Sequence, residues 1–214
     1  MTRDDTLEMI FRTRAVAIVR SPDADTAIRN AEAIVEGGLP VIEVSLTTPG
    51  AAQVIERLVD QAGVCAGAGT VMSREDVNRM ADLGVSFIVT PHFDEEIVSA
   101  GLERGLVMGP GVFTATDCAR ALAAGADLLK LFPAGLAGVS GMKALMDPFP
   151  QAKWLPTGGV SIDNAADWLQ AGASAVGVGS ELTRDGPENT LERARHVAAV
   201  LSSIPPLSAP KGTQ

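Results

Sequence analysis

The side chain with the clearest chemical potential is Lys130, at the centre of a short apolar run from Asp127 to Pro133. The run is too short for a helix and ends at a proline, which favours a buried strand of a parallel sheet. Desolvation favours the neutral form of an amine, and a neutral amine in a dry cavity can attack a carbonyl carbon to form a Schiff base. The alternative is a structural lysine that reaches the strand end or pairs with a carboxylate.

The other lysines contrast with this one. Lys143 falls in a predicted helix, Lys153 precedes a predicted strand and Lys211 lies in a polar tail, so all three have an easy route to water. Only Lys130 has a leucine on both sides.

Glu43 lies among apolar residues in the predicted strand 41–46. A desolvated carboxyl group holds its proton more readily, which suits it to exchanging protons near neutral pH. The alternative is a salt-bridge partner for Lys130 or Arg20 with no chemical role. In a barrel Glu43 and Lys130 would both point inward, and a lysine nucleophile beside a carboxylate is the minimum equipment of a class I aldolase.

Two glycine-rich segments follow the last predicted strands, at residues 157–161 and 177–180. Glycines let backbone N–H groups approach an anion, and in barrels the loops after the last two strands frequently bind phosphate. Ser161 is predicted to cap the helix after the first segment. Thr70 ends another predicted strand, where its hydroxyl either binds a substrate carboxylate or merely caps a helix.

The elements that position these residues repeat along the chain. Glycines at positions 63, 84, 105 and 125, separated by 21, 21 and 20 residues, each precede an apolar strand, which indicates a repeated βα unit. A first amphipathic helix presents Leu7, Ile10 and Phe11 on one face, and a last helix spans residues 189–201. The predicted strands cover residues 15–20, 41–46, 64–66, 87–89, 106–108, 128–129, 153–156 and 175–178.

Eight such units predict an α/β protein with a (β/α)₈ TIM barrel and an extra N-terminal helix. We expect a single domain over residues 1–204 and a C-terminal tail over residues 205–214. An open doubly wound sheet is the alternative, but one rim of a barrel collects more of the polar strand ends. These strand ends are Arg20, Thr47, Thr70, Thr90, Pro91, Pro110, Gly111, Pro133, Thr157, Gly158, Gly159, Gly179 and Ser180.

Four motifs, in order and spacing over residues 13–184, resemble the 2-keto-3-deoxy-phosphogluconate (KDPG/KHG) aldolase family. They are Val41–Leu46, Gly67–Val71, Leu129–Ala134 and Pro156–Gly159. The resemblance implies a homotrimeric barrel that reversibly cleaves a 2-keto-3-deoxy-6-phospho sugar acid to pyruvate and glyceraldehyde 3-phosphate, without metal or cofactor. By position it implies Lys130 as the Schiff-base lysine, Glu43 as the proton carrier, Thr70 on the carboxylate, Gly158, Gly159, Gly179 and Ser180 on the phosphate, and Pro91 and Thr157 as further substrate contacts.

One position separates two branches of that family. The phosphogluconate type carries an arginine just after its glutamate strand, where this chain has Thr47. The phosphogalactonate type instead has an arginine at the end of its first strand, which Arg20 matches, as do the sequences around Pro49 and Pro91. The alternatives are a 4-hydroxy-2-oxoglutarate aldolase, a phosphate-binding barrel isomerase or epimerase, and a non-catalytic sugar-phosphate binding protein.

Composition limits the other classes of function. The 214 residues carry a net charge of -9 with no basic stripe, which argues against a nucleic-acid partner. No apolar stretch approaches the roughly 18 residues of a membrane span, and no secretory signal precedes the first helix, so we expect a soluble cytoplasmic protein. The two cysteines and two histidines lack metal-ligand spacing, which argues against a zinc site or a cysteine protease.

Overall fold

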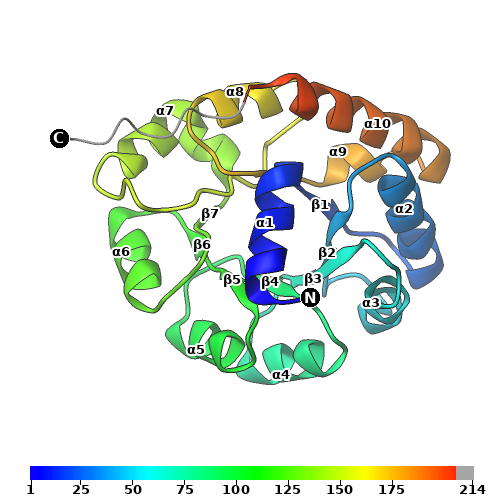
Figure 1. Cartoon of the computed structure of the whole chain (residues 1–214), viewed down its shortest axis with the longest axis horizontal. Helices are drawn as coiled ribbons and strands as arrows, with labels where there is room; N and C mark the ends of the chain where they lie inside the picture. Colours follow the sequence, from blue (N-terminus) through cyan, green and yellow to red (C-terminus); the bar gives the residue numbers. More distant parts are fainter. Residues whose placement is uncertain (206–214) are drawn as a thin grey trace.

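The computed structural model describes residues 1–205 of the chain. Its centre is a curled sheet of six parallel strands surrounded by helices (Figure 1). Around the sheet the strand order is β5-β4-β3-β2-β1-β8. The strands are β1 (Ala15–Val19), β2 (Val41–Ser45), β3 (Cys65–Gly69), β4 (Phe87–Val89), β5 (Val107–Gly109) and β8 (Val176–Val178). Except for Pro205, the C-terminal tail predicted for residues 205–214 lies outside the described residues.

A second, two-stranded parallel sheet consists of β6 (Gly111–Val112) and β7 (Lys130–Leu131). Only Pro110 separates β6 from β5, and a proline has no N–H to offer the ladder, which explains the break. The sequence predicted a single strand, at residues 106–108, in the place of β5 and β6.

The segment at residues 153–156, predicted as a strand, instead forms one isolated bridge, Leu129↔Trp154, and the residue after it forms another, Thr157↔Gly177. Pro156 cannot donate to a ladder, which limits regular pairing here. Backbone hydrogen bonds still connect the segment on both sides: Leu129 N to Lys153 O (2.7 Å), Thr157 N to Leu131 O (2.9 Å) and Gly177 N to Pro156 O (2.9 Å).

The helices lie outside the strands, except for α1, which lies across the centre of the ring in Figure 1. The last helix, α10, packs against α2, and Thr190 Oγ1 donates a hydrogen bond to Asn30 Oδ1 (3.2 Å) between them. The helices are α1 (Arg3–Thr13), α2 (Ala24–Glu36), α3 (Ala51–Val59), α4 (Arg74–Asp82), α5 (Glu95–Glu103), α6 (Ala115–Ala123), α7 (Ala134–Met146), α8 (Ala165–Gln170), α9 (Ser180–Thr183) and α10 (Pro187–Ser203).

Short sequence signals begin and end these helices. Four N-terminal side chains, those of Asp23, Ser73, Asp94 and Thr114, each accept a hydrogen bond from the backbone N–H three residues further on. The four regularly spaced glycines have φ angles of 81° (Gly63), 91° (Gly84), 72° (Gly105) and 86° (Gly125). Because this left-handed region favours glycine, the prediction that a glycine ends each helix is confirmed at Gly84, Gly105 and Gly125, which directly follow the C-cap residues of α4, α5 and α6. Gly63 instead lies in a turn three residues beyond Asp60, the C-cap residue of α3.

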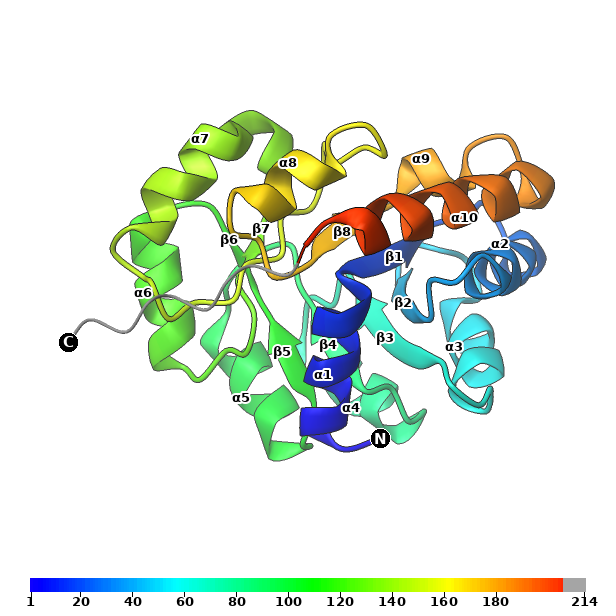
Figure 2. The same ribbon diagram turned by 45° about the horizontal axis from the view of Figure 1, so that its top comes forward.

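Two apolar clusters lie on the two sides of the curled sheet. The larger one fills the space between the strands and the outer helices. The smaller one lies inside the curl, where Phe87, Val107 and Leu128 pack with Ile10 of α1. Figure 2 shows α1 passing in front of β4 and β5. The predicted N-terminal amphipathic helix therefore covers one end of the sheet interior, and Ile10 is completely buried there.

Among the helices that the structure describes, none combines the length and the hydropathy that a bilayer crossing requires.

Replacing Ile10 tests whether α1 is an integral part of the fold. Ile10→Ala removes a fully buried side chain from the inner cluster and should lower the free energy of unfolding by about 2–5 kcal/mol, measured by urea denaturation. Glu8→Ala, an exposed position of the same helix, is the control and should change it by less than about 0.5 kcal/mol. Equal stability of the two variants would mean that α1 contributes little to the core.

Candidate active site

A cavity of about 340 Å³ opens where the carboxyl ends of the strands meet. This volume suits a small metabolite, since ligand pockets typically measure about 300–1,000 Å³. All ten residues predicted from the sequence to form a site line this one cavity. They are Arg20, Glu43, Thr70, Pro91, Lys130, Thr157, Gly158, Gly159, Gly179 and Ser180.

Lys130 lies on β7 with its side chain only 6% exposed. Its neighbours Leu129 and Leu131 belong to the outer apolar cluster, so strand alternation turns Lys130 inward. Its Nζ atom lies 5.5 Å from the centre of the Phe132 ring, within cation–π range. Lys143 and Lys153 are exposed, as predicted, and Lys211 lies outside the described residues.

Glu43 on β2 faces Lys130 across the cavity, with Oε1 3.5 Å from Nζ. Its side chain is 3% exposed, and its second oxygen, Oε2, has no hydrogen-bond partner among residues 1–205. The ion pair considered as an alternative is therefore present, yet it is too long for a strong hydrogen bond. A buried carboxylate oxygen without a partner is costly, so Oε2 is available to accept a proton from a bound ligand.

The absence of a side chain at Gly69 provides the space that the Glu43 carboxylate occupies. In β3, Gly69 pairs with Ser45 of β2, and a Cβ atom added to Gly69 would overlap Glu43 Oε1. Position 69 therefore requires glycine because any side chain would collide with the carboxylate, and not because the backbone needs a glycine conformation. The sequence contained Gly69 within a motif but offered no signal for this contact.

Three hydroxyl groups form a connected set beside the carboxylate. Ser45 Oγ lies 2.8 Å from Thr47 Oγ1 and 3.0 Å from Thr70 Oγ1. Thr70 has a φ angle of 60°, an uncommon conformation for a β-branched residue. Thr70 lines the cavity, whereas Ser45 is fully buried behind it.

The glycine-rich loop after residue 157 approaches the cavity through its backbone. Gly158 and Gly159 have φ angles of 79° and 90°, and neither N–H has a hydrogen-bond partner within residues 1–205. A Cβ atom would meet the Phe132 ring at 2.9 Å from Gly158 and the Gly135 Cα at 2.7 Å from Gly159. Steric crowding therefore requires glycine at both positions, and two backbone donors remain free to bind an anion.

The predicted helix start at Ser161 is wrong. Helix α8 begins at Ala165, and Asn164 precedes it as the N-terminal residue. Ser161 and Asn164 instead bind each other, because Ser161 N donates to Asn164 Oδ1 (2.8 Å) and Asn164 N donates to Ser161 Oγ (3.2 Å). The Ser161 hydroxyl group, predicted to cap the helix, therefore accepts a hydrogen bond within this local turn instead.

Arg20 follows β1 directly and lines the cavity, although it is exposed. It forms no ion pair or side-chain hydrogen bond within the described part of the chain. The structure thus gives no support to the alternative of a rim arginine paired with a surface acid.

Comparison with known proteins shows which family the chain resembles. The sequence model of the family described as KDPG and KHG aldolase matches residues 7–197. The chain belongs to this aldolase family. The 2-dehydro-3-deoxy-6-phosphogalactonate aldolase of Escherichia coli (strain K12) is 36% identical over 187 residues, which cover 86% of this chain and 90% of that protein.

Solved structures agree with this assignment. A structure described as native KDPGal is 34% identical with a TM-score of 0.83, covering 89% of this chain and 95% of its own. The KDPG aldolase of Legionella pneumophila, with pyruvate captured as a covalent carbinolamine intermediate, is 26% identical with a TM-score of 0.80. That match covers 93% of this chain and 97% of the other.

Several lining residues of this aldolase were not predicted as site residues. Phe132 stands two residues after Lys130, so strand alternation could have placed it on the cavity side. Ile18, Val160, Thr183 and Arg184 also line the cavity but lie outside the sequence motifs or carry no chemical signal of their own.

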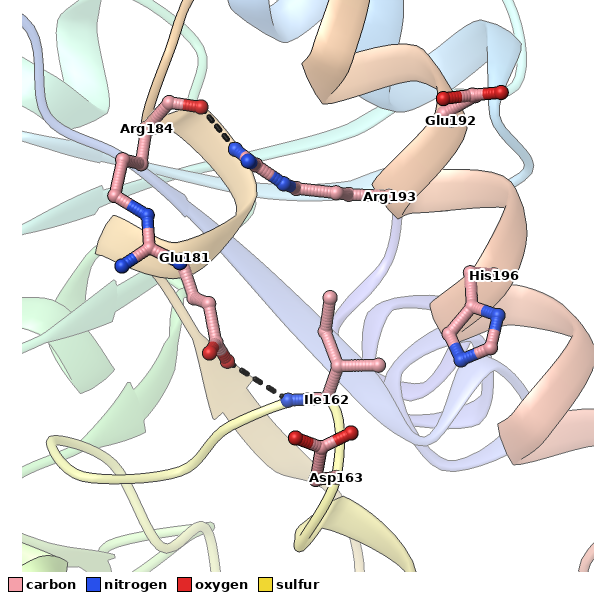
Figure 3. Close-up of a pocket in the computed structure, with 7 residues that line it drawn as sticks. All are labelled: Ile162, Asp163, Glu181, Arg184, Glu192, Arg193 and His196. Carbon is pink, nitrogen blue, oxygen red and sulfur yellow. Dashed lines mark hydrogen bonds between the residues drawn. The ribbon is translucent and has the colours of Figure 1, made fainter.

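Arg184 also borders a second hollow, of about 460 Å³, between the loop before α8, helix α9 and helix α10 (Figure 3). Glu181 Oε2 accepts a hydrogen bond from Ile162 N (2.9 Å), and Arg193 of α10 donates to Arg184 O and to Asp185 Oδ2. Helix α10 thereby fastens the loop that follows α9, the helix that begins at Ser180.

No group of three or more His, Cys, Asp or Glu side chains is arranged for a metal ion within residues 1–205.

Substitution of Gly69 tests whether the Glu43 carboxylate needs the space beside this residue. Gly69→Ala should displace the Glu43 carboxylate and lower turnover about a hundredfold, because misplacing a catalytic group by about 1 Å has that order of effect. Gly141→Ala in α7 is the control, since its methyl group meets only the Ala137 side chain, and it should retain turnover. Circular dichroism verifies the fold of both. Parental turnover in a folded Gly69→Ala protein would show that Glu43 does not need this position.

Proposed function

We propose that this aldolase uses Lys130 as a Schiff-base nucleophile and Glu43 as its proton carrier. The substrate is a 2-keto-3-deoxy-6-phospho sugar acid, cleaved reversibly to pyruvate and glyceraldehyde 3-phosphate. The observation that carries the proposal is the buried amine 3.5 Å from a buried carboxylate in one cavity. Neither the isomerase nor the non-catalytic binding protein needs an amine in this position.

The chemistry proceeds in four steps. The Lys130 amine attacks the ketone carbon, and Glu43 moves protons as the carbinolamine loses water to become a protonated imine. Glu43 then removes the proton of the hydroxyl group two carbons from the imine carbon. The bond between the carbons C3 and C4 breaks, the aldehyde leaves, and the imine accepts the electron pair as an enamine. Finally Glu43 returns the proton to C3, and water releases pyruvate and the free amine.

The two charged ends of such a substrate match two ends of the cavity. Arg20 and Thr70 are the proposed partners of the carboxylate, because a guanidinium fork and a hydroxyl both donate hydrogen bonds to it. The backbone N–H groups of Gly158 and Gly159, together with Gly179 and Ser180, are the proposed phosphate site. Pro91 and Thr157 also line the cavity.

Two features favour the phosphogalactonate type of substrate. Thr47 stands where the phosphogluconate type has an arginine, while Arg20 supplies a cation from the neighbouring strand. The Escherichia coli relative at 36% identity is named for 2-dehydro-3-deoxy-6-phosphogalactonate. Cleavage of 4-hydroxy-2-oxoglutarate is the second candidate, because the matching family model names KHG as well.

We also propose a closed (β/α)₈ barrel with α1 as an extra N-terminal helix, one domain over residues 1–204, and a homotrimer. The backbone hydrogen bonds that join β7, residues 153–157 and β8 support closure. The exposed side chains of Met72 (54%), Phe113 (43%) and Leu136 (79%) support an association between copies, since large apolar groups favour contact.

Borohydride trapping tests the nucleophile. Incubation with pyruvate and borohydride should add one reduced adduct to the parent protein, and peptide mapping should locate it on Lys130. Lys130→Met, which fills a similar volume, should abolish the adduct without unfolding the protein. Lys143→Met, an exposed control, should trap pyruvate normally. An adduct on Lys143 or Lys153 in the parent protein would overturn the assignment.

Arg20 tests the carboxylate end. Arg20→Ala should lower kcat/KM by about tenfold to several hundredfold, because a charge-assisted hydrogen bond contributes about 1.5–3 kcal/mol. Arg20→Lys keeps the charge without the bidentate fork and should recover only part of the loss. Arg12→Ala, at another exposed arginine that does not line this cavity, serves as the control. Unchanged kcat/KM in Arg20→Ala would place the carboxylate elsewhere.

A further inference from the structure

The hydroxyl group of Ser45 is a buried polar group that the mechanism leaves unused. Ser45 is fully buried and lies outside the cavity lining, so it does not touch a substrate there. Its Oγ atom nevertheless joins the hydroxyl of Thr47, at 2.8 Å, to that of Thr70, at 3.0 Å. Of these two partners, only Thr70 lines the cavity.

The fold brings these groups together from two strands. Glu43 and Ser45 point to the same side of β2, because side chains alternate along a strand, and Thr47 follows two residues later. Ser45 pairs in register with Gly69 of β3, so Thr70 begins the turn directly beside it. Leu46 N donates to Gly69 O (2.8 Å) and fixes this neighbourhood of the two strands.

The backbone N–H of Thr47 also donates to Ser45 Oγ (3.4 Å) and occupies one of its two lone pairs, so the hydroxyl protons of Thr47, Ser45 and Thr70 can be arranged in two ways. Each hydroxyl donates one hydrogen bond and accepts up to two. If Thr47 donates to Ser45 and Ser45 donates to Thr70, the Thr70 proton is left free to point into the cavity. In the reverse order Thr70 donates to Ser45 and offers the cavity only lone pairs. An anion in the cavity selects the first order, because a carboxylate oxygen only accepts hydrogen bonds.

We propose that Ser45 is a positioning residue that orients Thr70 as a hydrogen-bond donor to the carboxylate of the keto acid. This inference rests on the proposed function and adds a residue to its carboxylate end. Thr70, which makes this contact with Ser45, has a left-handed backbone conformation. Polarisation along connected hydroxyl groups strengthens the last donor, so Thr47 contributes through Ser45 without touching the substrate.

Titration calorimetry measures pyruvate binding to Ser45→Ala and reports it whether or not an imine forms. Borohydride trapping is measured in the same variant. Loss of the link should raise the pyruvate dissociation constant about fivefold, the value of one ordinary hydrogen bond. The trapping rate at saturating pyruvate should change by less than about twofold, because Lys130 and Glu43 are untouched. Ser45→Thr retains the hydroxyl and should bind pyruvate nearly as the parent does.

A double-mutant cycle separates this role from a purely structural one. If Ser45 acts through Thr70, Ser45→Ala should have no further effect on pyruvate binding in a Thr70→Ala background. Thr6→Val is the matched control, because it removes a fully buried hydroxyl in α1 and should leave pyruvate binding unchanged.

Two results would overturn the inference: parental pyruvate affinity in Ser45→Ala, or equal effects of Ser45→Ala with and without Thr70. Failure of the Schiff-base proposal has a different signature, because the parent protein would then form no borohydride adduct. The calorimetric cycle would still report whether Ser45 acts through Thr70 on a bound carboxylate.

Discussion

The buried pair of Lys130 and Glu43 is the interaction on which the rest of the site depends. Two charged groups in an apolar interior lose hydration, and their attraction compensates only when the geometry is favourable. At 3.5 Å the pair is close enough to stabilise both groups, yet Glu43 Oε2 has no hydrogen-bond partner in the part of the chain that the structure describes. The Lys130 amine and the Glu43 carboxylate are therefore both available to a ligand that exchanges protons with them.

A glycine, an aromatic ring and three hydroxyl groups accommodate the buried pair of Lys130 and Glu43. Gly69 leaves the volume in which the carboxylate lies, and the centre of the Phe132 ring lies 5.5 Å from the Lys130 amine. Next to them, the hydroxyl groups of Thr47, Ser45 and Thr70 satisfy one another instead of competing for Glu43. The polar interior therefore divides into a reacting part, made of the charged pair, and a binding part, made of neutral donors.

The two ends of the sheet have opposite characters. Helix α1 covers one end with Ile10 and an apolar cluster, which excludes water from below the reacting groups. The other end carries the turns and loops that line the cavity, and the backbone N–H groups of Gly158 and Gly159 there have no partner among the described residues. This separation of a packed end from a binding end is the division of labour expected of parallel strands whose carboxyl ends meet at one rim.

The sequence alone indicated ten of the residues that line the cavity, partly from burial, strand alternation and glycine spacing, which are local patterns, and partly from the family resemblance. Lys130 between two leucines, Glu43 in an apolar strand and the glycines that end α4, α5 and α6 were all predictable from such local patterns. Only the tertiary structure decided the contacts between strands: the overlap that Gly69 avoids and the link from Ser45 to Thr70. These depend on register and on side-chain conformation across neighbouring segments, and a linear pattern carries no record of either.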